Sequence, residues 1–184
     1  MTDYAQMMYK ICIVGDGAVG KTTILYRYVD GKFEKDTMMT VGTNFFMKEI
    51  LLDDLGIKVK FQIWDLGGQE HFAAVRPNFY AGAMGLIYTY DLTRHDSFVN
   101  LKNWKKEIEN VITKPIPSVI IGNKLDLVKH TSRIVSSRAL KRMLNELNAD
   151  GSFFTSAKTG EGIDEVFRKL AREIYISKKT VSSY

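Results

Sequence analysis

The chain has 184 residues, 45% of them hydrophobic and 26% charged, and it carries a formal net charge of +5 at pH 7. These values are typical of a globular domain and exclude collagen-like and intrinsically disordered chains. The basic residues are spread along the chain at helical spacing without interleaved aromatic residues, so we expect no nucleic-acid partner.

Strands and helices are predicted to alternate along the chain. Apolar runs predict strands near residues 9–14, 44–52, 57–64, 84–90, 117–122 and 152–155. Helical periodicity and capping residues, namely Ser97, Ser136 and Asp164, predict helices over residues 21–30, 97–112, 136–148 and 163–177. The short turn at residues 53–56 predicts an antiparallel hairpin between the second and third strands.

This alternation predicts an α/β fold with three layers, α/β/α, around a six-stranded, mostly parallel sheet with one antiparallel hairpin strand. We expect one domain over residues 1–184, with a core from about 9 to 176 and a short basic tail from 177 to 184. No apolar run approaches the roughly 18 residues of a membrane span, and no signal-peptide core is present, so a cytoplasmic protein is expected. The single cysteine, Cys12, is expected to be buried.

A phosphate-binding loop is predicted directly after the first strand. The pattern G-x-x-x-x-G-K-[ST] is met by Gly15, Gly20, Lys21 and Thr22, which makes the fold a P-loop NTPase type. Small residues let backbone N–H groups surround a polyphosphate, Lys21 would reach the β- and γ-phosphates, and Thr22 would bind Mg²⁺. The expected phosphate-binding residues are Gly15, Asp16, Gly17, Ala18, Val19, Gly20, Lys21, Thr22 and Thr23. The alternative is a glycine-rich turn with a solvated lysine.

Polar motifs also follow the third strand. Asp65 is placed to hold Mg²⁺ opposite Thr22, and Gly68 would offer its N–H to a γ-phosphate. The Gln69 amide can orient a water in line with that phosphate. A hydrophilic turn is the alternative, but its coupling to the phosphate loop favours the catalytic interpretation.

The last two strands end in residues that fit a guanine base. Asp126 can accept two hydrogen bonds from the N–H/NH₂ edge that guanine has and adenine lacks, while Asn123 braces the loop and the Lys124 stem packs on the ring. After the final strand, Ser156, Ala157 and Lys158 follow Thr155, and the Ala157 N–H could meet guanine O6.

These motifs, in order, resemble those of a known family. The set GDGAVGKT (15–22), Thr40, DLGGQ (65–69), NKLD (123–126) and TSAK (155–158) is similar to the five guanine-nucleotide motifs of the Ras superfamily of small GTPases, over nearly the whole chain. Within it, TVGTNFFMK (40–48) and RPNFYAGAMGLIYTYDLT (76–93) are similar to Rab segments. The resemblance implies GTP or GDP with Mg²⁺, bound by Thr22, Thr40 and Asp65, and slow hydrolysis by Gln69, Lys21 and Thr40.

The resemblance also implies partners. Phe45, Trp64 and Phe79 fall where Rab proteins carry an effector-facing aromatic triad, and an activating protein and an exchange factor are expected for a monomeric switch. Phe33 would stack on guanine, although a core anchor for its loop is the alternative. Met39, with the neighbouring Met38, could pack beneath the switch or form an adaptable partner surface.

Three features depart from the Rab pattern. The chain ends without the prenylated cysteines of most Rab proteins, so we expect no lipid anchor in it and only weak contact of its basic residues with anionic membranes. Gly67 replaces an alanine and is expected to loosen the switch II hinge. Thr37 replaces a tyrosine that closes over the phosphates in many relatives, and it also stands where Gα proteins carry a built-in arginine.

Two other functions stay open at this point. One is a GTP-binding scaffold with little or no hydrolysis, in which the Gly67 hinge misplaces Gln69. The other is a P-loop ATPase or small-molecule kinase, for which Asp126 would not read the base.

Overall fold

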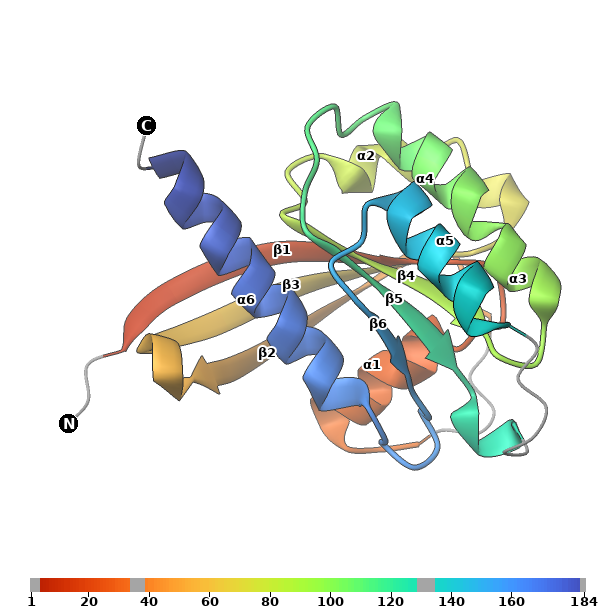
Figure 1. The fold of residues 1–184 in the computed structure, drawn as a ribbon, viewed down its shortest axis with the longest axis horizontal. Coiled ribbons are helices and arrows are strands. Elements are labelled where there is room, and N and C mark those ends of the chain that lie inside the picture. Colours follow the sequence, from red (N-terminus) through yellow and green to blue (C-terminus); the bar gives the residue numbers. More distant parts are fainter. Residues whose placement is uncertain (1–3, 34–38, 129–134, 183–184) are drawn as a thin grey trace.

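The computed structural model describes residues 4–33, 39–128 and 135–182, and its centre is one six-stranded sheet (Figure 1). The strands are β1 (Ala5–Val14), β2 (Thr43–Leu52), β3 (Ile57–Leu66), β4 (Gly85–Asp91), β5 (Ser118–Asn123) and β6 (Ser152–Phe154). Their order in the sheet is β2-β3-β1-β4-β5-β6. Among the strand pairs of the described residues, only β2–β3 is antiparallel, which confirms the predicted fold class.

Helices cover both faces of the sheet. One face is packed against α1 (Lys21–Asp30) and the long α6 (Ile163–Ser182), and the stacked rings of Tyr28 and Phe167, 3.7 Å apart, join these two helices. The other face is packed against α2 (Pro77–Tyr80), α3 (His95–Val99), α4 (Leu101–Glu109) and α5 (Ser137–Leu147). Because both faces of β1 are covered near its end, Ile11 to Val14 are fully buried and apolar.

Several predicted boundaries differ from the structure. The helix predicted over 97–112 is divided at Asn100 into α3 and α4, and Ser97 is buried inside α3, where it donates to the Arg94 carbonyl. The sequence pattern missed α2, which is only four residues long. The last helix continues to Ser182, so most of the predicted tail is helical.

Other local predictions agree with the structure. Ser136 caps α5 by accepting a hydrogen bond from the Ala139 N–H at 3.2 Å. The β2–β3 hairpin is closed by a short 3₁₀ helix, Asp53–Leu55, and by Gly56 in the left-handed conformation, φ +64°. In the part of the chain that the structure describes, every helix is too short or too polar to cross a membrane.

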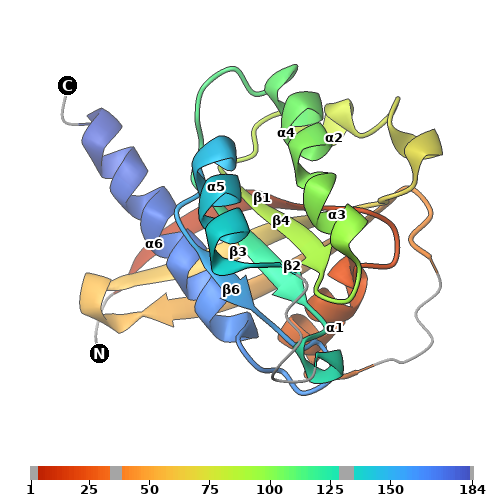
Figure 2. The ribbon, with the colours of Figure 1, turned by 45° about the vertical axis from the view of Figure 1, so that its right-hand side comes forward.

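The sheet positions the candidate site at the carboxyl ends of its parallel strands. The ends of β1, β3 and β5 and the loop after β6 lie near the start of α1, as Figures 1 and 2 both show. Loops from distant parts of the sequence therefore meet at the carboxyl ends of parallel strands, where ligands bind in open α/β sheets.

Candidate functional site: a nucleotide-sized cavity at the strand ends

Lys21 is the central charge of the phosphate loop. It is the first residue of α1 and is only 5% exposed. Its Nζ donates to the carbonyl oxygens of Gly15 at 2.6 Å and Asp16 at 2.9 Å, so the side chain lies inside the curve of the loop. Burial lowers the pKa of Lys21 to about 8, against the opposing effect of the nearby Asp65 and Asp16 carboxylates.

The glycines of this region allow close backbone approach. A Cβ at Gly15 would lie 2.0 Å from the Thr89 carbonyl oxygen, and one at Gly20 would lie 2.4 Å from Asn123 Nδ2. A Cβ at Gly68 would lie about as close to the backbone of Asp16 and Gly17, at 2.4 Å and 2.5 Å. The DLGGQ segment is therefore packed directly on the phosphate loop at Gly68.

Three side-chain oxygens cluster at the start of α1. Thr22 Oγ1 lies 2.6 Å from Thr40 Oγ1 and donates to Asp65 Oδ2 at 2.5 Å. Burial raises the pKa of Asp65, with Lys21 and the two threonines acting in the opposite direction. Asp65 Oδ1 is buried without a hydrogen-bond partner among the described residues. This set of hard oxygen donors with one unsatisfied carboxylate oxygen fits Mg²⁺, which keeps few protein ligands.

The DLGGQ segment is attached to α4 through Arg76. The buried guanidinium of Arg76 donates to the carbonyl oxygens of Gly67 at 3.1 Å and Gln69 at 2.8 Å, and to Glu107 at 2.6 Å and 2.7 Å. Tyr80 Oη donates to the same carboxylate at 2.6 Å. Burial raises the pKa of Glu107, but the hydrogen bonds from Arg76 and Tyr80 outweigh it, so the net shift is downward.

Gly67 has a different role from the one expected. Its N–H donates to the Gly42 carbonyl at 2.8 Å, and a Cβ there would lie 2.9 Å from the Phe72 ring and from that same carbonyl oxygen. In this structure the second glycine therefore allows tight packing between the segments after β3 and before β2, rather than a looser hinge.

The opposite end of the cavity carries the predicted base-reading residues. Asn123 Nδ2 donates to the Val19 carbonyl at 3.0 Å, which joins this loop to the phosphate loop. Ser156 Oγ donates to Asp126 Oδ1 at 2.7 Å and so orients an exposed carboxylate. The Ala157 N–H, expected at guanine O6, is donated to Asn123 Oδ1 at 3.2 Å, so binding of O6 would have to share or replace this bond.

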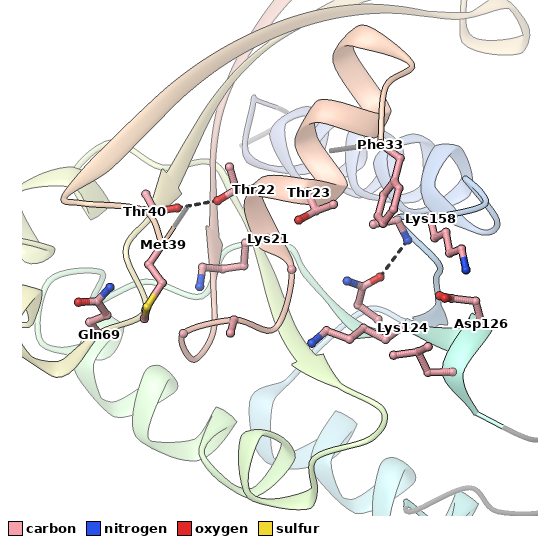
Figure 3. A pocket seen from close by; sticks show the side chains of 17 residues that line it. Lys21, Thr22, Thr23, Phe33, Met39, Thr40, Gln69, Lys124, Asp126 and Lys158 are labelled. Carbon is pink, nitrogen blue, oxygen red and sulfur yellow. Dashed lines mark hydrogen bonds between the residues drawn. The ribbon is translucent and has the colours of Figure 1, made fainter. Parts of the chain in front are cut away.

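One cavity of about 540 Å³ connects the two ends. Figure 3 shows Lys21, Thr22 and Thr40 at one end and Phe33, Lys124 and Asp126 at the other. The lining residues are Gly17, Ala18, Gly20, Lys21, Thr22, Thr23, Phe33, Met39, Thr40, Gly68, Gln69, Asn123, Lys124, Asp126, Leu127, Ala157 and Lys158. Phe33 is 38% exposed, so its position at the cavity fits the stacking role better than that of a core anchor.

Some predicted residues lie behind the lining instead. They are Gly15, Asp16, Val19, Asp65 and Ser156. Each of them forms a hydrogen bond with a residue that does line the cavity. The Asp16 carboxylate is turned outward, where it accepts hydrogen bonds from Asn100 at 2.8 Å and from the Trp104 indole at 2.9 Å. Thr37 and Met38 lie outside the described residues.

Sequence reasoning missed several supporting residues. Arg27, in the last turn of α1, donates to the Ala157 carbonyl at 3.0 Å and holds the loop after β6. Met39 lines the cavity, where its Cε would lie 3.6 Å from a Cβ added at Gly17, and it is 58% exposed, so both roles expected for it stay open. Asp91, Arg94 and Arg76 were missed because none of them belongs to the five nucleotide motifs. Asp91 ends β4 and Arg94 follows it, and this position at a strand end was the signal for those two residues. Arg76, which precedes α2, had no such signal.

The three rings of the predicted aromatic triad lie in contact, with Trp64 touching the other two. The Phe45 and Trp64 rings lie 5.2 Å apart, Trp64 and Phe79 lie 5.3 Å apart, and Phe45 is 47% exposed. The triad joins β2, β3 and α2, so its shape depends on the segments around Thr40 and Gln69.

The motifs and their geometry agree with comparisons to known proteins. A model of the Ras family matches residues 10–176. The chain is 40% identical to the Ras-related protein Rab-1C of Dictyostelium discoideum over 91% of its length and 81% of that protein, and 37% identical to Rab-21 of the same organism over 98% and 82%. It is 36% identical to human Rab-8B over 91% and 78%. With a family match over most of its length and these identities, the chain belongs to the Ras family of small GTPases and is Rab-like.

Proposed function

We propose that the protein is a molecular switch that binds GTP or GDP with Mg²⁺ and slowly hydrolyses GTP to GDP and phosphate, in a Rab-like trafficking role. Membership of the Ras family shows that the protein is a small GTPase. The observation that supports the finer proposal is the cavity that has the buried Lys21 at one end and the Asp126 carboxylate at the other.

The phosphates would lie against the loop of residues 15–23. Lys21 would sit beside the β- and γ-phosphate oxygens, and the N–H groups from Ala18 onward would donate to them at the positive end of α1. Thr22, Thr40 and Asp65 would hold Mg²⁺, which when bound would neutralise charge on the phosphate oxygens.

Hydrolysis would depend on how the attacking water is positioned. Gln69 lies at the phosphate end of the cavity, next to Met39 and close to Gly17, where its amide can orient a water for in-line attack (Figure 3). Arg76 holds the Gln69 carbonyl and so limits the positions of that amide. We expect intrinsic turnover on the order of 10⁻⁴ to 10⁻³ s⁻¹, with an activating protein that supplies an arginine.

Loss of the γ-phosphate would release two segments at once. Thr40 and Gly68 line the phosphate end of the cavity, and the Phe45–Trp64–Phe79 triad is built on β2, β3 and α2, which adjoin their segments along the chain. An effector on this triad could therefore distinguish the GTP form from the GDP form. We expect the protein to act as a monomer in the cytoplasm and to reach membranes through its partners.

The decisive experiment changes the base rather than the phosphates. Asp126→Asn should weaken GTP binding by about 10²-fold or more and permit xanthosine triphosphate, whose edge matches an amide at this position. Equilibrium competition with the two nucleotides measures both changes. Unchanged GTP affinity in this variant would overturn the guanine assignment and favour an ATPase or a kinase.

Chromatography of the nucleotide released from acid-denatured protein tests the hydrolysis step. Bound GDP is the expected result. Bound intact GTP that persists for hours after loading would contradict turnover and favour a GTP-binding scaffold.

A further inference from the structure

A turn between β4 and α3 contacts both loops of the nucleotide cavity from behind. Arg94 Nη2 donates to the Gly17 carbonyl oxygen at 2.7 Å, in the phosphate loop. The Asp91 carboxylate, only 6% exposed, pairs with Lys124 Nζ at 2.7 Å, in the base-reading loop. Neither Asp91 nor Arg94 lines the cavity. Residues 91–94 therefore connect its two ends without reaching a bound nucleotide.

The turn is itself held by hydrogen bonds. Thr93 donates its N–H and its hydroxyl to Asp91 Oδ1, at 2.8 Å and 2.7 Å, and the Arg94 N–H donates to the Asp91 carbonyl at 3.0 Å. Burial alone raises the pKa of Asp91, but the hydrogen bonds from Lys124 and Thr93 outweigh it and hold the pKa below its usual value. Asp91 is therefore a charged, oriented partner for Lys124 at neutral pH.

Each contact falls beside unusual backbone. Three non-glycine residues in the described part of the chain have positive φ: Ala18 at +61°, Lys124 at +69° and Asn148 at +52°. Asn148 ends α5, a place where this conformation is common. Ala18 lies in the phosphate loop and Lys124 precedes the 3₁₀ helix Leu125–Leu127, so neither residue ends a helix, and the left-handed conformation costs them energy. These are the two places that Arg94 and Asp91 support.

The geometry of the peptide bond explains what Arg94 does at Ala18. In a trans peptide the carbonyl of Gly17 and the N–H of Ala18 point in opposite directions. Arg94 holds the Gly17 oxygen on the outer side of the loop, so the Ala18 N–H is directed to the inner side, and Ala18 lines the cavity. A donor behind the loop thus fixes a donor in front of it, where a phosphate would lie.

We propose that Asp91 and Arg94 are positioning residues that hold the base-reading loop and the phosphate loop in their left-handed conformations, and that they set the lifetime of the bound nucleotide. This inference rests on the proposed function, guanine-nucleotide binding. Arg94 acts on the phosphates through Ala18, whereas Asp91 acts on the base and ribose through Lys124.

The test compares nucleotides with different numbers of phosphates. Dissociation of a fluorescent GDP analogue, and competition of GDP and GMP against it, are measured for Arg94→Gln and Asp91→Asn. Loss of one charge-assisted hydrogen bond predicts about tenfold faster GDP release in each variant. For Arg94→Gln, GMP affinity should change less than threefold, since the Ala18 amide serves the outer phosphates. For Asp91→Asn, GDP and GMP should weaken equally.

Matched controls come from a second arginine–aspartate pair. Arg172 and Asp54 form an exposed pair, 2.7 Å at one contact, that joins α6 to the β2–β3 turn away from the cavity. Arg172→Gln and Asp54→Asn should leave GDP release within twofold of the unmodified protein. Arg94→Lys, which keeps the charge and a donor, provides a second variant and should give a release rate between those of the unmodified protein and Arg94→Gln.

The outcomes separate the two proposals. If the unmodified protein does not bind GDP, the proposed function fails. If it binds GDP but both variants release it within twofold of the unmodified rate, the positioning role is wrong. Equal losses of GDP and GMP affinity in Arg94→Gln would also overturn it, because a general loosening of the fold does not distinguish the phosphates.

Discussion

The two ends of the nucleotide cavity handle charge in opposite ways. At the phosphate end Lys21 and Asp65 are 5% and 0% exposed, and burial shifts the pKa of each toward its neutral form. At the base end Asp126 is exposed and is oriented by a single hydroxyl, that of Ser156. Buried charges without a ligand cost stability, whereas exposed ones do not. The phosphate end is therefore preorganised for nucleotide affinity, which lowers the stability of the nucleotide-free protein. The base end selects the base with little loss of stability.

Removing the buried charge gives the largest expected effect. Lys21→Met keeps the length of the side chain without its ammonium, so GDP affinity should fall by about 10³-fold or more. The free energy of unfolding of the nucleotide-free protein should rise by about 2 kcal/mol at pH 7, because a poorly solvated cation is gone. Urea unfolding and GDP binding measure the two changes.

Asp126→Asn is the matched comparison at the base end. It should change the stability of the nucleotide-free protein by less than about 0.5 kcal/mol, since the carboxylate is exposed and the amide oxygen still accepts from Ser156. Equal stability changes in the two variants would contradict the contrast between buried and exposed charge.

The next prediction concerns the ion pair of Arg76 and Glu107, which attaches the DLGGQ segment to α4. Glu107→Gln leaves the Arg76 guanidinium buried without its counter-charge, so unfolding free energy should fall by about 2 to 3 kcal/mol. Glu146→Gln breaks an exposed pair with Lys102 on the neighbouring helices and should cost less than about 0.5 kcal/mol. Thermal and urea unfolding of both variants with GDP bound provide the measurement, and equal losses would show that Arg76 needs no partner.

A smaller effect is expected for Gly67→Ala. The new methyl group would lie 2.9 Å from the Gly42 carbonyl oxygen and the Phe72 ring and 3.1 Å from the Thr40 carbonyl oxygen, which predicts a loss of about 1 to 2 kcal/mol. At Gly151 the nearest atom to such a methyl group is 3.5 Å away, so Gly151→Ala is a control within about 0.5 kcal/mol. A Gly67→Ala protein as stable as the unmodified one would restore the interpretation of Gly67 as a loose hinge.

Sequence reasoning reached the parts of the site that are written as local motifs. The phosphate loop could be predicted because Gly15, Gly20 and Lys21 are close in the chain, and the side chain of Lys21 returns to the carbonyl of Gly15. Contacts between distant segments could not be predicted in this way. Arg94 reaches a carbonyl 77 positions earlier in the chain, and no periodicity encodes that distance.

The fold shows the same division. Six strands, the β2–β3 hairpin and a mostly parallel sheet follow from apolar runs and from the rule that alternating elements give parallel sheets, whereas the order of the strands was not predicted. Asn100 has helical backbone angles, so no local signal marks the division of the predicted helix there. The helix Pro77–Tyr80 is too short to show a period. Both features depend on tertiary packing.

The smallest expected effect is a pH dependence confined to the phosphate end. Lys21 has a pKa of about 8 without nucleotide, and bound phosphates would raise that pKa by favouring the ammonium form. Binding above pH 8 must then take up a proton, so GDP affinity should fall as pH rises, by about fourfold between pH 7.0 and 8.5. In Lys21→Arg the cation does not titrate, so its weaker binding should be flat over this range. A pH slope that persists in Lys21→Arg would assign the titration to another group, and a flat unmodified protein would mean that the buried lysine keeps its proton without the phosphates.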